Sequence, residues 1–154
     1  TWLAPGHPSS LEPGRRPRTT LTPTLTLRDG RPWFAMGSPG GDQQDQWQLR
    51  ALLRMIVGGY RAQEAIDAPG LHSTALPESF WPRTWTPAGA VVEDRLGEEV
   101  IRGLERRGHV VTRAGDWSLG RVSAVGREPS ADGSADVLWA AANPRGMQGY
   151  ASGR

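Results

Sequence analysis

The stretch TLTPTLTLRDGRPWFAMGSPGGD, residues 20–42, predicts a β-hairpin that leads directly into a helix. Leucine alternates with threonine over residues 24–27, which is the period of a strand with one buried face. Asp29 and Gly30 form a typical two-residue hairpin turn, and residues 32–36 continue as an apolar strand. We therefore expect two antiparallel strands, the second of which ends just before a pair of glycines.

A helix is expected to follow that glycine pair. Residues 42–60 carry apolar side chains three or four positions apart, the spacing of a mostly buried helix. Asp42 is a suitable N-cap, because its carboxylate can accept a hydrogen bond from a free N–H of the first turn. Gly58 and Gly59 are expected to end the helix.

The pair Gly40 and Gly41 is the candidate site of the stretch. Glycine loses more backbone freedom on folding than any other residue, so two in succession indicate a local need. At the start of a helix their N–H groups lie beside the positive end of the helix dipole, where a developing oxyanion is stabilised. The alternative is a tight turn that needs a positive φ. A phosphate-binding P-loop is excluded, because that motif requires a lysine and the chain has none.

The rest of the sequence predicts an α+β domain. Residues 1–18 contain four prolines and no apolar period, so we expect an irregular arm followed by one domain over residues 19–154. Helices are predicted over 61–68 and 94–107, the second with a Glu98–Arg102 pair on its outer side. Residues 71–76 and 79–89 are expected to be extended chain and loop. Strands are predicted over 109–114, 120–126 and 136–142.

Composition excludes several classes of protein. The chain has 154 residues, no cysteine and a net charge of only +2, and its 18 basic residues are all arginines scattered among acids. We therefore expect no nucleic-acid partner, since no dense basic stripe is present. No apolar run approaches the roughly 20 residues of a membrane-spanning helix. The compartment is left open.

Four blocks of the sequence resemble the γ-glutamyltransferase (γ-glutamyltranspeptidase) family. The most specific is RRPRTTLTPTLTLRDGRPWFAMGSPGGD, residues 15–42, in which a basic run, a hydroxyl pair, a hairpin and a glycine pair follow at fixed intervals. AQEAIDAP, the isolated Glu93, LERRGH and the terminal AAANPRGMQGYASG match the order and spacing of that family as well. The resemblance extends over nearly the whole chain.

The resemblance implies a fold and a reaction. The family belongs to the N-terminal-nucleophile hydrolases, which form a four-layer αββα sandwich from the large and small subunits of a self-cleaving precursor. An N-terminal threonine of the small subunit attacks the γ-glutamyl amide of a donor such as glutathione, without a metal or cofactor, and the acyl-enzyme passes to water or an amine. By position, Thr19 and Thr20 bind the donor carboxylate, whereas Gly40 and Gly41 form the oxyanion hole. From the residues alone, Thr19 and Thr20 could simply begin a strand.

The chain departs from the family where the nucleophile would be. The Thr-Thr-His-like start and the segment behind it are absent, and Thr1 matches a region downstream of them. We therefore expect the C-terminal portion of a small subunit that has no nucleophile, is inactive alone and needs the large subunit. Smaller departures are Asn143 in place of an aspartate and Gly70 in place of an arginine.

Other residues offer weaker candidates. The three histidines, His7, His72 and His109, lack a neighbouring ligand at metal-binding spacing, so no metal site is predicted. Trp81 and Trp85 are expected to pack a loop onto a core or onto another subunit. Two further functions stay open: an amidohydrolase similar to the cephalosporin acylases, and a non-catalytic α+β interaction module in which Pro-Gly-Gly is only a turn.

Overall fold

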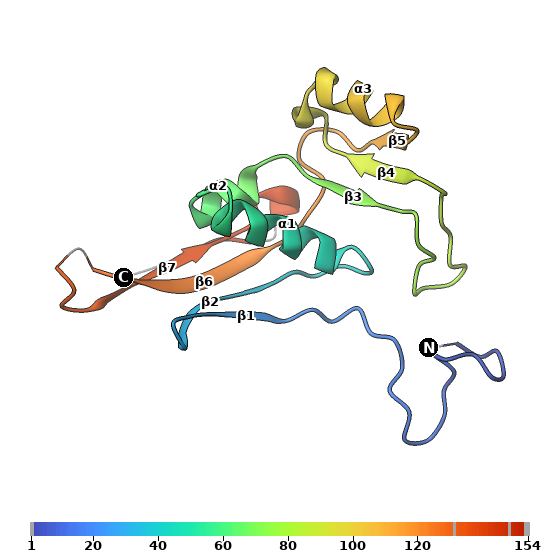
Figure 1. The fold of residues 1–154 in the computed structure, drawn as a ribbon, viewed down its shortest axis with the longest axis horizontal. Coiled ribbons are helices and arrows are strands. Elements are labelled where there is room, and N and C mark those ends of the chain that lie inside the picture. Colours follow the sequence, from blue (N-terminus) through green and yellow to red (C-terminus); the bar gives the residue numbers. More distant parts are fainter. Residues whose placement is uncertain (1, 131, 148, 153–154) are drawn as a thin grey trace.

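Two β-sheets with their helices make up the computed structural model, which describes residues 2–130, 132–147 and 149–152. The larger sheet has the order β1-β2-β6-β7, and all of its neighbouring strands are antiparallel (Figure 1). Its strands are β1 (Thr24–Arg28), β2 (Arg31–Gly37), β6 (Ser123–Pro129) and β7 (Asp136–Ala141). The smaller sheet has the order β3-β4-β5, with strands β3 (Leu71–Ser73), β4 (Gly89–Val92) and β5 (Val110–Arg113). Together with the helices, the sheets give an α+β fold.

The predicted hairpin forms β1 and β2. Arg28 pairs with Arg31, so Asp29 and Gly30 are the two turn residues. Both have positive φ, 52° for Asp29 and 74° for Gly30, as the turn that matches the twist of two antiparallel strands requires. The register shifts once, between Thr26 and Leu27. The hairpin prediction is confirmed.

One face of the larger sheet is covered by α1 (Gln44–Ile56) and α2 (Ala62–Asp67), and the core lies between them (Figure 1). The buried core comprises Phe34, Met36, Trp47, Ala51, Ile66, Val122, Ala124 and Ala141. Helix α1 ends just before Gly58 and Gly59, as predicted, and Gly59 has a φ of 69°. Trp47 and Ala51 of the predicted apolar face are buried against the sheet. The prediction of a mostly buried helix is wrong, because Leu49, Leu53 and Ile56 expose 55%, 50% and 53% of their surface.

The opposite face of the larger sheet is open and apolar. Leu25, Val125 and Leu138 expose 65%, 59% and 79% of their surface. Because side chains alternate between the two faces of a strand, these residues point away from the buried Phe34 and Ala124. No helix or strand of the described residues covers this face in Figure 1, although Ala151 of the C-terminal segment lines hollows in it.

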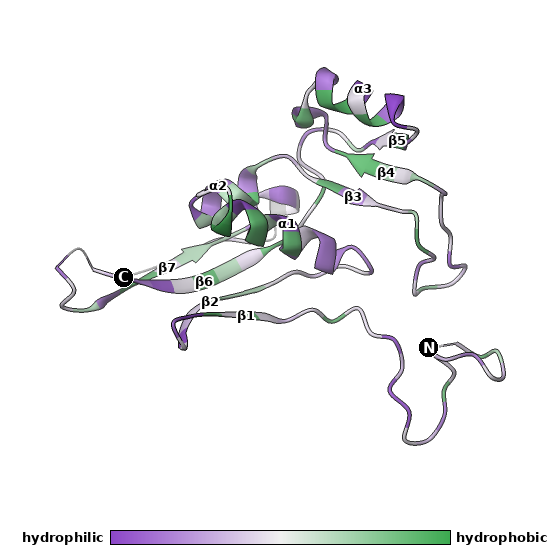
Figure 2. Ribbon diagram, viewed as in Figure 1, coloured by the Kyte–Doolittle hydropathy of each residue, from purple (hydrophilic) through white to green (hydrophobic). Residues whose placement is uncertain are grey.

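The smaller sheet carries α3 (Glu98–Arg106), and Figure 2 shows that both β4 and α3 contain apolar residues. Val92 and Ile101 are fully buried there. The single helix predicted over 94–107 is wrong: a 3-10 turn, η1 (Asp94–Leu96), precedes α3. Gly97 separates the two with a φ of 85°, which no α-helix contains. Strand β4 was not predicted, and it pairs with β5 in parallel.

The arm and the long loop add little regular structure. From residue 2 to residue 23 the structure describes no helix or strand, apart from a single bridge between Trp2 and Ser10. The predicted boundary at residue 18, between an irregular arm and a single domain, stays a prediction. Trp81 and Trp85, in the loop between β3 and β4, are 85% and 55% exposed and so do not pack onto the core of this chain.

Candidate functional site

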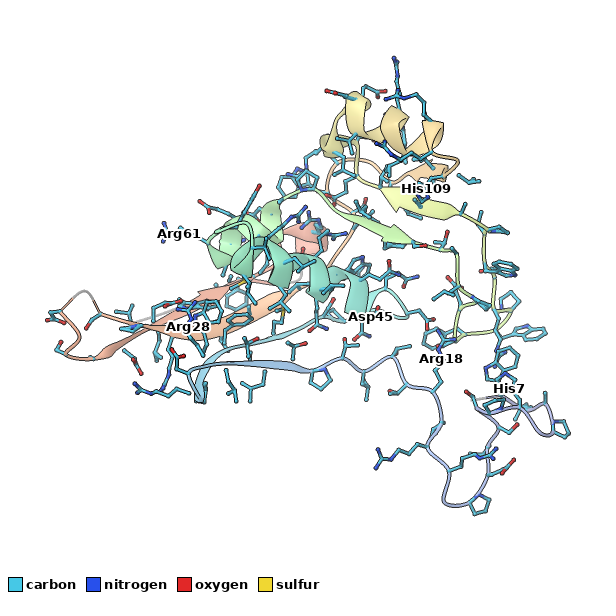
Figure 3. All side chains as sticks on the ribbon, in the orientation of Figure 1. His7, Arg18, Arg28, Asp45, Arg61 and His109 are labelled. Carbon is cyan, nitrogen blue, oxygen red and sulfur yellow. The ribbon has the colours of Figure 1, made fainter. Side chains whose placement is uncertain are left out.

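A pocket of about 410 Å³ lies beside the start of α1. Three segments form its walls: the chain entering β1, the first turn of α1 and the stretch after β3. Figure 3 labels Arg18 and Asp45, which belong to two of these walls. The lining residues include Thr19, Thr20 and Gly41, so the fold brings three of the four predicted site residues to one pocket.

Gly40, the fourth, does not line the pocket but lies behind it, against α1. Its φ is +140°, a conformation that residues with a side chain rarely adopt. A Cβ at this position would meet Trp47 Cζ3 at 2.9 Å. Gly40 is therefore required by conformation and by space, whatever its chemical role.

The carbonyl groups of Gly40 and Gly41 are both hydrogen-bonded, whereas among the described residues their N–H groups are not. The Gln44 side chain donates from Nε2 to the Gly40 carbonyl at 2.6 Å, and the Gln44 N–H donates to the Gly41 carbonyl at 3.3 Å. Among the described residues, no acceptor is recorded for the N–H of Gly40 or of Gly41. The geometry leaves these two donors for another group, as an oxyanion site requires.

Asp42 does not cap the helix, and the N-cap prediction is wrong. The N-cap residue is Gln43, which has helical φ and ψ and makes no capping hydrogen bond from its side chain. Instead Asp42 accepts hydrogen bonds from the Ser79 N–H at 2.6 Å, the Ser79 hydroxyl at 2.5 Å and Arg18 Nη2 at 2.6 Å. The carboxylate thus ties the loop between β3 and β4 to the start of α1.

These partners also set the ionisation of Asp42. Burial opposes its negative charge, but the hydrogen bonds from Ser79 and the positive charge of Arg18 outweigh burial and hold its pKa below the usual range. Arg18 also donates to the Pro77 carbonyl at 3.2 Å. The loop therefore forms a fixed wall of the pocket while Asp42 is ionised.

The two predicted hydroxyl residues differ in their surroundings. Thr19 is exposed, and its Oγ1 accepts a hydrogen bond from the Leu21 N–H at 3.1 Å. Thr20 is half-buried, and no hydrogen bond of its hydroxyl to the described residues is recorded. Both precede β1, so the alternative in which they begin a strand is wrong.

Two glutamines of α1 were not singled out from the sequence. Gln44 and Gln48 expose only 6% and 4% of their surface, although glutamine at a helical position usually indicates an outer face. Gln48 donates to the Thr22 carbonyl at 2.7 Å and to its hydroxyl, and it accepts from Thr24 Oγ1 at 2.8 Å. Their spacing of four residues, on the side of the helix that carries Trp47 and Ala51, was the available signal.

A second cluster of charged residues is buried and satisfied. Glu93 accepts hydrogen bonds from Arg145 Nε at 2.6 Å, from Arg145 Nη2 at 2.9 Å and from the Gly70 N–H at 2.7 Å. Arg145 donates in addition to the Ile66 carbonyl, and the Asn143 side chain bonds to the Arg145 backbone at both ends. This cluster joins the end of α2 to the smaller sheet, and Arg145 lines a cavity of only about 10 Å³, too small for a substrate.

Gly70 belongs to the same cluster. A Cβ there would lie 2.8 Å from the Cβ of Leu119, so no larger residue has room.

The three histidines do not come together in one site. In the described ranges no group of three or more histidines and carboxylates could hold a metal ion. His7 and His109 lie far apart in Figure 3, and His72 is buried against Trp47, whose Nε1 donates to its Nδ1 at 3.3 Å. Thr1 lies outside the described residues. Within those residues, too, no helix has the length and apolarity to cross a membrane.

Known sequences that are similar to this chain come from one family and its relatives. A sequence profile of the gamma-glutamyltranspeptidase family matches residues 1–153. The glutathione hydrolase-like YwrD proenzyme of Bacillus subtilis is 31% identical over 86% of this chain and 26% of its own length. The Acylase ACY 1 proenzyme of Pseudomonas sp. (strain SE83) is 30% identical over 89% of this chain and 22% of its own length. The chain thus spans about a quarter of these relatives.

Solved structures show the same fold. LmbA2991HD is 53% identical and superposes over the whole chain and 27% of its own length, with a TM-score of 0.89. Cephalosporin acylase from Bacillus halodurans is 26% identical over 93% of this chain and 24% of its own, with a TM-score of 0.73. An acivicin-inhibited gamma-glutamyltranspeptidase, at 22% identity, resembles the chain in fold, with a TM-score of 0.74.

Proposed function

The chain belongs to the gamma-glutamyltranspeptidase family, and from that premise we propose that it forms the C-terminal part of the small subunit of an enzyme that cleaves γ-glutamyl amides such as glutathione. The acyl group passes through a threonine ester to water or to an amine. The threonine nucleophile lies on sequence outside this chain, so these 154 residues alone are inactive. No metal or organic cofactor takes part in the proposed reaction.

In this proposal the pocket beside α1 holds the γ-glutamyl group. Thr19 and Thr20 donate hydrogen bonds to its α-carboxylate, and the N–H groups of Gly40 and Gly41 stabilise the negative charge that develops on the scissile carbonyl oxygen. The observation that carries the proposal is that Thr19, Thr20 and Gly41 line one pocket although they come from separate segments. The two unengaged N–H groups support it.

The open face of the larger sheet completes the proposed architecture. Leu25, Val125 and Leu138 leave an apolar surface that a lone soluble domain would normally cover. We assign this face to the second sheet of a four-layer αββα sandwich, supplied by the large subunit and the remainder of the small one. The proposed partner is therefore the rest of the same precursor.

Replacing the two threonines by valine tests the assignment, because valine keeps the shape and removes the hydroxyl. In the precursor that contains this chain, Thr19→Val and Thr20→Val are expected to raise KM for a γ-glutamyl anilide about tenfold each, the equivalent of about 1.4 kcal/mol. Thr112→Val, on β5, is the matched control. A processed precursor that releases no anilide overturns the proposed activity.

The similarity to two acylases supports a second candidate, an amidohydrolase whose acyl group lacks the α-amino function. Glutaryl anilide differs from γ-glutamyl anilide by that amino group alone. If the precursor turns over the glutaryl compound and not the γ-glutamyl one, the acylase is the correct function. If it turns over neither, the non-catalytic module replaces both.

A further inference from the structure

Gln44 is a buried amide whose two polar atoms are both engaged. Its Nε2 donates to the Gly40 carbonyl at 2.6 Å, and its Oε1 accepts from the Thr22 hydroxyl at 3.1 Å. Only 6% of the residue is exposed. A buried amide is stable only when it is satisfied, so these two contacts fix both the rotamer of Gln44 and the groups that it bonds.

The contact with Gly40 determines where the next N–H points. The Gly40 carbonyl and the Gly41 N–H belong to one planar peptide group, and this bond is trans, so the two point in opposite directions. Holding the carbonyl against α1 therefore directs the Gly41 N–H away from α1. Gly41 lines the pocket beside the helix, where that donor is available.

Without such a contact the peptide between two glycines would be free to rotate. Neither residue has a Cβ, so the conformations that point the carbonyl toward or away from the helix differ little in steric cost. A donor aimed at a developing charge is effective only when its orientation is fixed before the reaction. The Gln44 amide supplies that constraint.

The same amide connects the two halves of the proposed site. Thr22, which bonds Gln44, lies two residues after Thr20 and is itself held by Gln48. A displacement of the threonine segment would thus be transmitted to the glycine pair. These contacts join residues about 20 positions apart in the sequence without passing through solvent.

We propose that Gln44 is a positioning residue. It orients the Gly41 N–H toward the substrate oxyanion and couples this donor to the segment that carries Thr19, Thr20 and Thr22. The inference rests on the proposed acyl-transfer function for its effect on rate. Its structural half, the orientation of the peptide, does not depend on which amide is cleaved.

The test is Gln44→Met in the precursor that contains this chain, because methionine has a similar length and flexibility but no donor. We expect kcat for the active anilide to fall about 100-fold, the effect of removing one oxyanion donor, with KM changed less than about twofold. Gln63→Met is the matched control: Gln63 likewise bonds a backbone carbonyl, that of Ala142, at 2.9 Å, but away from the pocket. Its kcat should stay near the unsubstituted value.

Two further measurements separate positioning from simple loss of structure. A boronate analogue of the acyl group forms a tetrahedral adduct, so Gln44→Met should weaken its binding about 100-fold and leave product binding unchanged. Gln44→Glu preserves the shape and the acceptor for Thr22 but has no donor when it is ionised. At a pH where the carboxylate is ionised it should reproduce the loss if Gln44→Met folds poorly.

A crystal structure of the variant decides the structural half. A rotated Gly40–Gly41 peptide supports the proposal, even if neither anilide is turned over and the proposed function has failed. An unrotated peptide, or a loss of kcat no larger than that of Gln63→Met, overturns it.

Discussion

Two regions of the molecule hold an arginine against a carboxylate at the same distance and differ in burial. Arg145 Nε lies 2.6 Å from Glu93 Oε1, and Arg18 Nη2 lies 2.6 Å from Asp42 Oδ1. The first pair exposes 3% and 0% of its side chains, whereas the second exposes 37% and 17%. The Arg145–Glu93 contact therefore connects elements inside the protein, whereas the Arg18–Asp42 contact forms part of the wall of an open pocket.

The difference shows that burial, more than the ion pair itself, decides what each contact does. Glu93 also accepts from the N–H groups of Ser118 and Leu119, so its charge is fully paired inside the protein. Burial disfavours its ionised form, yet the hydrogen bonds from Arg145, Leu119 and Gly70 outweigh burial and lower its pKa. Asp42 instead faces solvent on one side and fixes a loop that substrate can approach.

The largest expected effect is at the buried pair. Glu93→Gln should reduce the free energy of unfolding by about 3–5 kcal/mol, because it leaves the Arg145 charge buried without a counter-charge. Urea unfolding of the precursor, followed by tryptophan fluorescence, measures the loss. Adding Arg145→Met to Glu93→Gln removes the unpaired charge and keeps an acceptor for the N–H groups of Gly70 and Leu119, so it should recover part of the loss. A loss of unfolding free energy smaller than that caused by Asp42→Asn would contradict the comparison.

Asp42→Asn should cost less, about 1.5–3 kcal/mol, the usual contribution of hydrogen bonds to a charged group. Because the loop that lines the pocket is released, KM should rise as well. Asp45→Asn is the control, because Asp45 lies in the first turn of α1 and its carboxylate accepts, among the described residues, a hydrogen bond from the neighbouring Gln46 N–H. Equal effects of the two substitutions would mean that the charge near the helix start matters and the loop contact does not.

The same residue predicts a pH dependence with a definite sign. The pKa of Asp42 is lowered in the folded chain, so its contribution to stability is complete above its unfolded pKa of about 3.9. It is lost as the pH falls through the lower folded value. The difference in thermal midpoint between the unsubstituted protein and Asp42→Asn should therefore vanish in acid.

The glycine pair should respond unequally to alanine. Gly40→Ala is expected to cost about 1–3 kcal/mol, because alanine is strained at a φ of +140° and its Cβ meets Trp47. Gly41→Ala has no such strain, and its Cβ would lie 3.2 Å from the Phe80 ring, in an exposed loop that can yield. Thermal melting of both variants tests the order, and equal midpoints would contradict it.

The smallest effect is expected on the outer side of α3. The predicted Glu98–Arg102 pair is present at 3.4 Å, and Arg113 bonds Glu98 at 2.6 Å, but all three side chains are largely exposed. Exposed pairs contribute little because water and salt screen them. Glu98→Gln should leave the thermal midpoint unchanged within error at physiological salt, and a drop as large as that of Asp42→Asn would be unexpected.

Local patterns were sufficient where neighbouring residues set the conformation. The hairpin at Asp29 and Gly30 depends on two backbone angles, and the position of α2 before Pro69 depends on a residue that cannot continue a helix. Strand β4, by contrast, is an apolar run of four residues without alternation, and so short a run does not distinguish a buried strand from other buried chain. Gly97 occurs in an otherwise regular helical pattern, and its φ of 85°, which glycine adopts readily, breaks that pattern.

The sequence by itself determined the hairpin, the presence of a helix after the glycine pair, and the family, because each depends on residues close together or on their order along the chain. Tertiary structure alone decided that Asp42 bonds Ser79 instead of capping α1, and that Gln44 is buried against Gly40 and Thr22. Ser79 lies 37 positions from Asp42. Such partners are selected by how the elements pack, and a local pattern carries no information about packing across that separation.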